Sequence, residues 1–97
     1  MRIIAKKTLR VFWNREARAK TPLEAWYAET KHADWKSSAD VKAKYGSASI
    51  LKCNRVVFNI AGNTYRLIVA INYEMGIVYI RFLGTHAEYN KIDAETV

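Results

Sequence analysis

"RVVFNIAGNTYRLIVAINYEMGIVYIRFLG", residues 55–84, specifies the architecture of this 97-residue chain. It holds three runs rich in β-branched and aromatic residues, at 55–60, 64–73 and 77–84, and such runs are typical of β-strands. The links between them are three residues long and contain glycine, which is typical of tight hairpins. The stretch therefore predicts an antiparallel meander of three strands.

The predicted strands have two different faces, because successive side chains of a strand point to opposite sides. One face is almost wholly apolar and is expected to pack on helices: Val56, Phe58, Ile60, Tyr65, Leu67, Val69, Ile71, Val78, Ile80 and Phe82. The other carries three arginines and no acidic side chain: Arg55, Val57, Asn59, Arg66, Ile68, Ala70, Asn72, Ile77, Tyr79, Arg81 and Leu83. Arginine holds phosphate through two parallel hydrogen bonds, so this face suggests an anionic ligand. Exposed arginines that only provide solubility and protect a sheet edge explain it equally well.

The residues before the meander predict helices, so the expected fold class is α+β, in one domain spanning residues 1–97. The predicted elements are a strand at 2–5, a helix at 6–19, a helix from Thr21 to about His32, a short helix within 34–46 and a short strand at 47–51. Thr21 and Glu24 have the spacing of a capping box, and Pro22 suits the first helical position. Ser37 is the expected cap of the short helix and Gly46 its stop. The two longer helices are joined by a very short link, which predicts a helical hairpin.

The segment "GTHAEYNK" begins at Gly84, where the last strand is expected to end. Thr85 and Glu88 again have the capping-box spacing, which predicts a short C-terminal helix from about His86. His86 and Tyr89 would then share one side of that helix, near its N-terminus, where anions are attracted. Both side chains can transfer protons. In the alternative interpretation, Tyr89 and Ile92 pack on the core and His86 is idle in solvent.

The composition limits the possible partners. The net charge of +7, from 16 basic and 9 acidic residues, favours nucleic acid over an acidic protein or a membrane surface. Cys53 is the only cysteine, which excludes an internal disulfide and a cysteine-rich zinc site and fits a reduced, cytoplasmic setting. No secretory signal is expected from the sequence, and no apolar run approaches the roughly 20 residues of a membrane span. The spacing of His, Asp and Glu forms no metal site, so neither a metal nor a cofactor is expected.

The runs "HADWKSSADVKAKYGSASIL" (32–51) and "NRVVFNIAGNTYRLIVAINYEMGIVYIRFLGTHAEYNKIDAETV" (54–97) closely resemble the HigB toxins of bacterial type II toxin–antitoxin systems. These toxins are RelE-like endoribonucleases, also called mRNA interferases. The resemblance implies a small antiparallel sheet backed by two N-terminal helices, and a toxin that cuts messenger RNA without a metal, commonly in the ribosomal A site. It also implies a HigA-type helix-turn-helix antitoxin, with operator DNA bound only through the toxin–antitoxin complex.

The resemblance also implies which residues contact the RNA. Arg66, in "YRL", corresponds to the arginine that such toxins place against the scissile phosphate, with Arg55 or Arg81 assisting. Asn59 and Lys52 complete the set expected to bind RNA. As an exposed arginine on a strand, Arg66 is expected to contribute little to stability.

Proton transfer is assigned by the same resemblance to the C-terminal segment. His86 and Tyr89, in "GTHAEY", and the nearby Lys91 are the candidates for general base and general acid, and the sequence does not divide these roles among them. Cys53 and Ala61 stand where polar or charged residues are frequent in the family, which predicts weaker catalysis rather than a different reaction. Two other classes remain open: a non-catalytic module that inhibits translation by binding RNA or the ribosome, and a protein-interaction domain for an acidic partner.

Overall fold

The computed structural model describes all of residues 1–97 and contains one five-stranded sheet with the strand order β1-β5-β4-β3-β2. The strands are β1 (Arg2–Ile4), β2 (Ser49–Ile50), β3 (Arg55–Ile60), β4 (Tyr65–Asn72) and β5 (Ile77–Thr85). The pairs β3–β4 and β4–β5 are antiparallel, which confirms the predicted meander. The first strand joins β5 in parallel and β2 pairs antiparallel with β3, so the meander forms the centre of the sheet.

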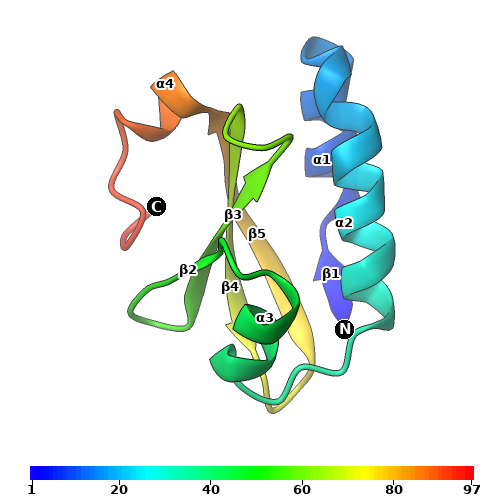
Figure 1. The fold of residues 1–97 in the computed structure, drawn as a ribbon, viewed down its shortest axis with the longest axis vertical. Coiled ribbons are helices and arrows are strands. Elements are labelled where there is room, and N and C mark those ends of the chain that lie inside the picture. Colours follow the sequence, from blue (N-terminus) through cyan, green and yellow to red (C-terminus); the bar gives the residue numbers. More distant parts are fainter.

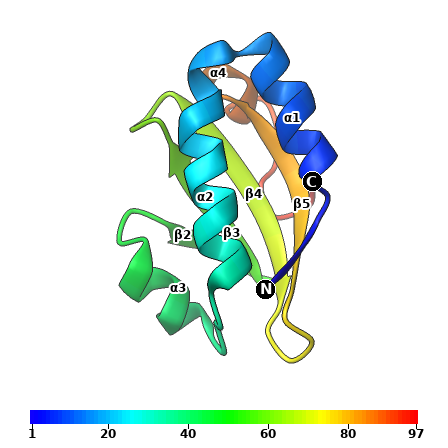
Figure 2. The ribbon, with the colours of Figure 1, turned by 90° about the vertical axis from the view of Figure 1, so that its right-hand side faces the viewer.

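Two helices, α1 (Lys6–Arg15) and α2 (Lys20–His32), form the predicted hairpin, joined by a 3₁₀ turn at Ala17–Ala19. Both helices lie against one face of the sheet (Figure 2). The short helix α3 (Ser38–Lys44) follows, and the last helix, α4 (His86–Tyr89), lies with the C-terminal segment on the other side of the sheet (Figure 1). The fold class is therefore α+β, as predicted. No helix combines the length and the apolar composition needed to cross a membrane.

The core lies between the helical hairpin and the apolar face of the sheet. Leu9 of α1 and Leu23 of α2 are fully buried there, and the Trp26 ring packs edge-on against Phe58 at a centroid distance of 5.4 Å. Trp35, between α2 and α3, is only 6% exposed and belongs to this core. Fully burying a large apolar side chain contributes about 1.5–3 kcal/mol, so this layer is a main source of stability.

Helix ends are the least well predicted part of the fold. The first helix ends at Arg15 rather than at residue 19, because the chain turns into the 3₁₀ segment. The predicted capping box of Thr21 and Glu24 is wrong: α2 already begins at Lys20, whose amide donates to a carbonyl of the preceding turn, so no side-chain cap is used. Ser37 makes no capping hydrogen bond either, although it directly precedes α3 as predicted.

A β-bulge changes the expected faces of β5. Ile68 of β4 pairs with Phe82, but the next residue, Val69, pairs with Ile80, so Arg81 is an extra residue in β5. A bulge reverses the alternation of side chains beyond it. Phe82 therefore lies on the face opposite the helices and Leu83 packs on the helix side, the reverse of the prediction.

Candidate functional site

The face of the sheet opposite α1 and α2 carries the three predicted arginines, Arg55, Arg66 and Arg81, and is called the arginine face below. Arg55 pairs with Ala70, which lies four residues from Arg66 on β4 and therefore shares its face. Arg81, at the bulge, donates to the same backbone carbonyl as Arg55, that of Val97. The expectation that the three arginines lie on one side of the sheet is confirmed.

Arg66 is held firmly in place rather than exposed. The residue is only 9% exposed, and its Nη2 donates to the Asn63 Oδ1 at 2.7 Å. Its Nη1 donates to the carbonyls of Asn63 and Tyr65, at 3.2 and 3.5 Å. The expectation of an exposed arginine is wrong because β4 is the central strand and the β3–β4 turn lies over its end. Asn63 was missed, although its position three residues before Arg66 in a tight turn was a usable signal.

The neighbour of Arg66 across the strand pair is Gly84 of β5. A Cβ at Gly84 would lie 2.6 Å from the Phe82 ring and 3.1 Å from the Cβ of Glu88. Only glycine leaves room there, so the Phe82 ring can lie over the backbone beside Arg66. The end of β5 and the start of α4 therefore pack closely together beside Arg66.

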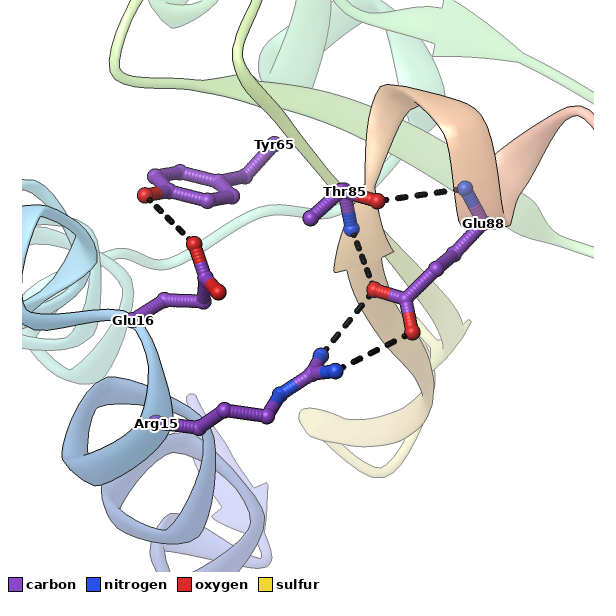
Figure 3. Close-up of polar contacts among 5 residues, drawn as sticks. All are labelled: Arg15, Glu16, Tyr65, Thr85 and Glu88. Atoms are coloured by element: carbon purple, nitrogen blue, oxygen red, sulfur yellow. Dashed lines mark hydrogen bonds and ion pairs between the residues drawn. The ribbon is translucent and has the colours of Figure 1, made fainter.

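The predicted capping box at the start of α4 is confirmed (Figure 3). The Glu88 amide donates to the Thr85 Oγ1 at 3.2 Å, and the Thr85 amide donates to the Glu88 Oε1 at 2.9 Å. Arg15 of α1 also donates to both carboxylate oxygens of Glu88, from Nη2 to Oε1 at 3.0 Å and from Nη1 to Oε2 at 3.2 Å. The hydrogen bonds from Arg15 and from the Thr85 backbone lower the pKa of Glu88 from 4.5 to about 2. This carboxylate therefore fastens α4 to the helical hairpin.

Arg15 was missed because it lies 73 residues from Glu88 in the sequence. Figure 3 shows a second polar link beside this pair, in which the Tyr65 hydroxyl donates to the Glu16 Oε1 at 3.2 Å. The first link joins the end of α1 to α4, and the second joins the residue after α1 to the start of β4. The orientation of α4 is thus fixed from outside the C-terminal segment.

The structure brings one of the three predicted proton-transfer residues to Arg66. The Tyr89 ring is half-buried, and its centroid lies 5.6 Å from the Arg66 guanidinium carbon. His86 is exposed; its amide donates to the Thr64 carbonyl at 3.1 Å, which places it at the same end of the sheet. Lys91 is exposed and its side chain makes no hydrogen bond or ion pair within the chain.

The middle of the arginine face is partly covered. The Val97 carbonyl accepts hydrogen bonds from Arg55 Nη1 at 2.5 Å and from Arg81 Nε at 3.4 Å. Val57 and Ile68 on this face are only 3% and 0% exposed, although α1 and α2 lie on the other side. The C-terminal segment runs along this side of the sheet (Figure 1). Arg55 and Arg81 are therefore engaged within the chain.

The two remaining candidates for RNA contact differ in their surroundings. The Asn59 Nδ2 donates to the Ser47 carbonyl at 3.2 Å and so ties the start of the β2 segment to β3. Lys52 is exposed in the turn before β3. No three His, Cys, Asp or Glu side chains are grouped in a way that could hold a metal ion.

The protein has a helical hairpin on one face of a mixed five-stranded sheet, and arginines and a tyrosine on the other face. This small α+β architecture is compatible with the RelE-like fold. The HigB toxin family, described as the RelE-like toxic component of a toxin–antitoxin system, matches residues 19–92. The chain belongs to this family: it is a toxin, and the family implies an antitoxin as its partner. No match was found among the curated proteins.

Proposed function

We propose that this toxin is an endoribonuclease that cleaves messenger RNA in the ribosomal A site and thereby stops translation in the cytoplasm. The observation that carries the proposal is the pairing of Arg66 and Tyr89, with a guanidinium 5.6 Å from the centre of a phenol ring. A fixed cation beside a proton-transfer group is what phosphodiester cleavage requires. Membership of a RelE-like toxin family supports the same reaction.

Arg66 would hold the scissile phosphate. A guanidinium has five N–H donors, and the three hydrogen bonds within the chain leave two of them for a ligand. Asn63 fixes the plane of the guanidinium, which lowers the entropy lost when phosphate binds. The positive charge would then stabilise the additional negative charge of the phosphorane transition state.

The reaction uses the nucleophile that RNA itself supplies. A general base takes the proton of the 2′-hydroxyl, the 2′-oxygen attacks phosphorus, and the bond to the 5′-oxygen breaks as a general acid protonates that oxygen. Tyr89 is the side chain placed beside the phosphate site, and His86 lies at the same end of the sheet. Lys91 is a third candidate in the same segment. No metal takes part in this proposed scheme.

Arg55 and Arg81 would assist by binding phosphates next to the cleaved bond. Both now donate to the Val97 carbonyl, so the C-terminal segment has to move aside before RNA can take its place. Lys52, in the turn before β3, and Asn59, near the end of β3, would extend the contact with the RNA backbone. Binding through several phosphates predicts a strong dependence of affinity on salt.

The antitoxin is proposed to be a HigA-type protein with a helix-turn-helix domain. Operator DNA would be bound by that domain, so the toxin reaches DNA only within the complex. The support for this partner is family membership together with the net charge of +7, which attracts an acidic inhibitor as well as RNA.

The alternative is a non-catalytic inhibitor that binds RNA or the ribosome through the arginine face. One observation favours it: of the three candidate proton-transfer residues, only Tyr89 contacts Arg66. The deciding experiment adds purified toxin to translating ribosomes and maps new 5′ ends on the message. New ends within the A-site codon are expected of the enzyme, whereas arrested translation on intact message would establish the inhibitor.

A matched control for this assay is Arg18→Ala. Arg18 lies in the 3₁₀ turn, is exposed and makes no side-chain hydrogen bond, so its loss removes the same charge away from the arginine face. It is expected to cleave like the unaltered toxin. Arg66→Lys, which keeps the charge and loses the planar fork, is expected to cleave at least tenfold more slowly.

A further inference from the structure

A hollow of about 460 Å³ lies at the end of the sheet away from α4, beside the arginine face. It is lined by Cys53, Asn54, Ala70, Ile71, Asn72, Tyr73, Glu74 and Tyr79. None of the residues after β5 contributes to it, so the C-terminal segment does not fill it. Its volume is within the range of about 300–1,000 Å³ that is common for small-ligand sites.

The hollow follows from the pairing of the strands. Ala70 on the central strand pairs with Arg55 on one side and with Tyr79 on the other. Because neighbouring strands are about 4.8 Å apart, the small alanine leaves a gap between the two large side chains. Tyr79 is 37% exposed, so part of its ring borders open space.

The rim opposite Tyr79 is held by an unusual turn. Cys53 and Asn54 both have left-handed backbone conformations, with φ of 58° and 59°. The Asn54 carbonyl accepts a hydrogen bond from the Ile71 amide at 2.9 Å, which fixes the turn against β4. The Asn54 side chain itself makes no hydrogen bond in the chain, so its donor and its acceptor are both available.

The lining selects against phosphate and in favour of a neutral ring. It contains no lysine or arginine, and its one charged residue is the acidic Glu74. Asn72 adds a neutral amide; its Oδ1 accepts from the Met75 amide at 2.9 Å, which leaves its NH₂ group to donate. Proteins commonly bind a nucleobase by stacking it on an aromatic ring and forming hydrogen bonds to its edge from polar side chains such as amides.

We propose that this hollow binds one base of the RNA substrate, with the base stacked on Tyr79 and its edge read by Asn54 and Asn72. The proposal rests on the proposed function, since it names a recognition subsite for the same RNA. Ala70 lies four residues along β4 from Arg66, a distance of about 13 Å, so the base belongs to a nucleotide beyond the cleaved bond. Arg55, directly next to the hollow, is placed to hold the phosphate of that nucleotide.

The first test measures binding without any cleavage. Cys53 is the only cysteine, is exposed and lines the hollow, so the rate of its alkylation by iodoacetamide reports occupancy. We expect at least one of AMP, GMP, CMP and UMP to slow alkylation twofold or more at millimolar concentration, and ribose 5-phosphate to have no effect. Equal protection by ribose 5-phosphate, or protection by none of the four nucleotides, would overturn the proposal even if the toxin cleaves RNA.

The second test compares the cleavage sites of variants on translating ribosomes. Tyr79→Ala is expected to weaken the preference for a base at one position near the cut by about tenfold, as follows from the loss of one stacked base. Tyr79→Phe retains the ring and should retain the preference. Met75→Ala, at an exposed residue of the same hairpin outside the lining, is the control. If folded Tyr79→Ala and Asn54→Ala toxins keep the same base preference, the subsite is refuted. If the unaltered toxin itself cleaves no message, the proposed function is refuted instead.

Discussion

Replacing Glu88 by glutamine tests how α4 is attached to the rest of the molecule. The lowering of its pKa from 4.5 to about 2 corresponds to about 3 kcal/mol of stabilisation if solvent is ignored. The Glu88 side chain is 42% exposed and that of Arg15 53%, so solvent screening reduces this contribution to about 1 kcal/mol. We therefore expect Glu88→Gln to lower the free energy of unfolding by about 1 kcal/mol at pH 7.

The pH dependence of this effect has a definite sign. Because the pKa of Glu88 is depressed in the folded state, its stabilisation is fully present above pH 4.5 and is lost as the pH falls towards 2. Urea unfolding of both proteins should therefore show a difference at pH 7 that shrinks at pH 2.5. Glu24→Gln is the matched control, since Glu24 is exposed and is not used as a cap. An equal difference between toxin and Glu88→Gln at both pH values would refute the ion-pair explanation.

Three further predictions concern residues around Arg66. Arg66→Ala should lose detectable cleavage and also about 1–3 kcal/mol of stability in urea unfolding, because the residue is only 9% exposed and the two Asn63 oxygens that it binds would lose their donor. Unchanged stability would show that these hydrogen bonds contribute nothing. Tyr89→Phe and His86→Ala should each slow cleavage on ribosomes by about a hundredfold with unchanged ribosome binding, since each removes a proton-transfer group; full activity in both would leave α4 a purely structural helix. Gly84→Ala should destabilise the fold by about 1–3 kcal/mol through the 2.6 Å contact with the Phe82 ring, and the added change Phe82→Ala should remove that clash, whereas a neutral Gly84→Ala would contradict the packing.

The sequence predicted the elements whose signal is local. The meander was predictable because β-branched runs and glycine-containing links coincide in residues 55–84, and the α4 capping box because Thr85 and Glu88 are three residues apart. The same spacing at Thr21 and Glu24 gave a wrong prediction. There the helix begins one residue earlier, at Lys20, whose amide donates to the Ala17 carbonyl of the preceding 3₁₀ turn, so Thr21 lies inside the helix rather than at its cap.

The features that the sequence did not predict depend on contacts between distant segments. The bulge at Arg81 is a mismatch between two strand lengths, and alternation within one strand does not reveal it. Likewise, the burial of Arg66 depends on what covers the sheet, and the anchor of Glu88 comes from α1. The sequence predicted that Arg66 and Tyr89 lie near each other. It did not predict that Arg55 and Arg81 donate hydrogen bonds to the Val97 carbonyl.

The central claim is that this toxin cleaves RNA by using the substrate's own 2′-hydroxyl. It is tested most directly with a message that carries a single 2′-O-methyl group at the nucleotide 5′ to the mapped cut, translated by purified ribosomes in the presence of the toxin. We predict that the modified message stays intact at that bond while the unmodified message is cut there, because the attacking oxygen is blocked and Arg66 and Tyr89 supply no nucleophile of their own. Cleavage of the modified bond at the normal rate, or arrested translation with neither message cut, would contradict the mechanism.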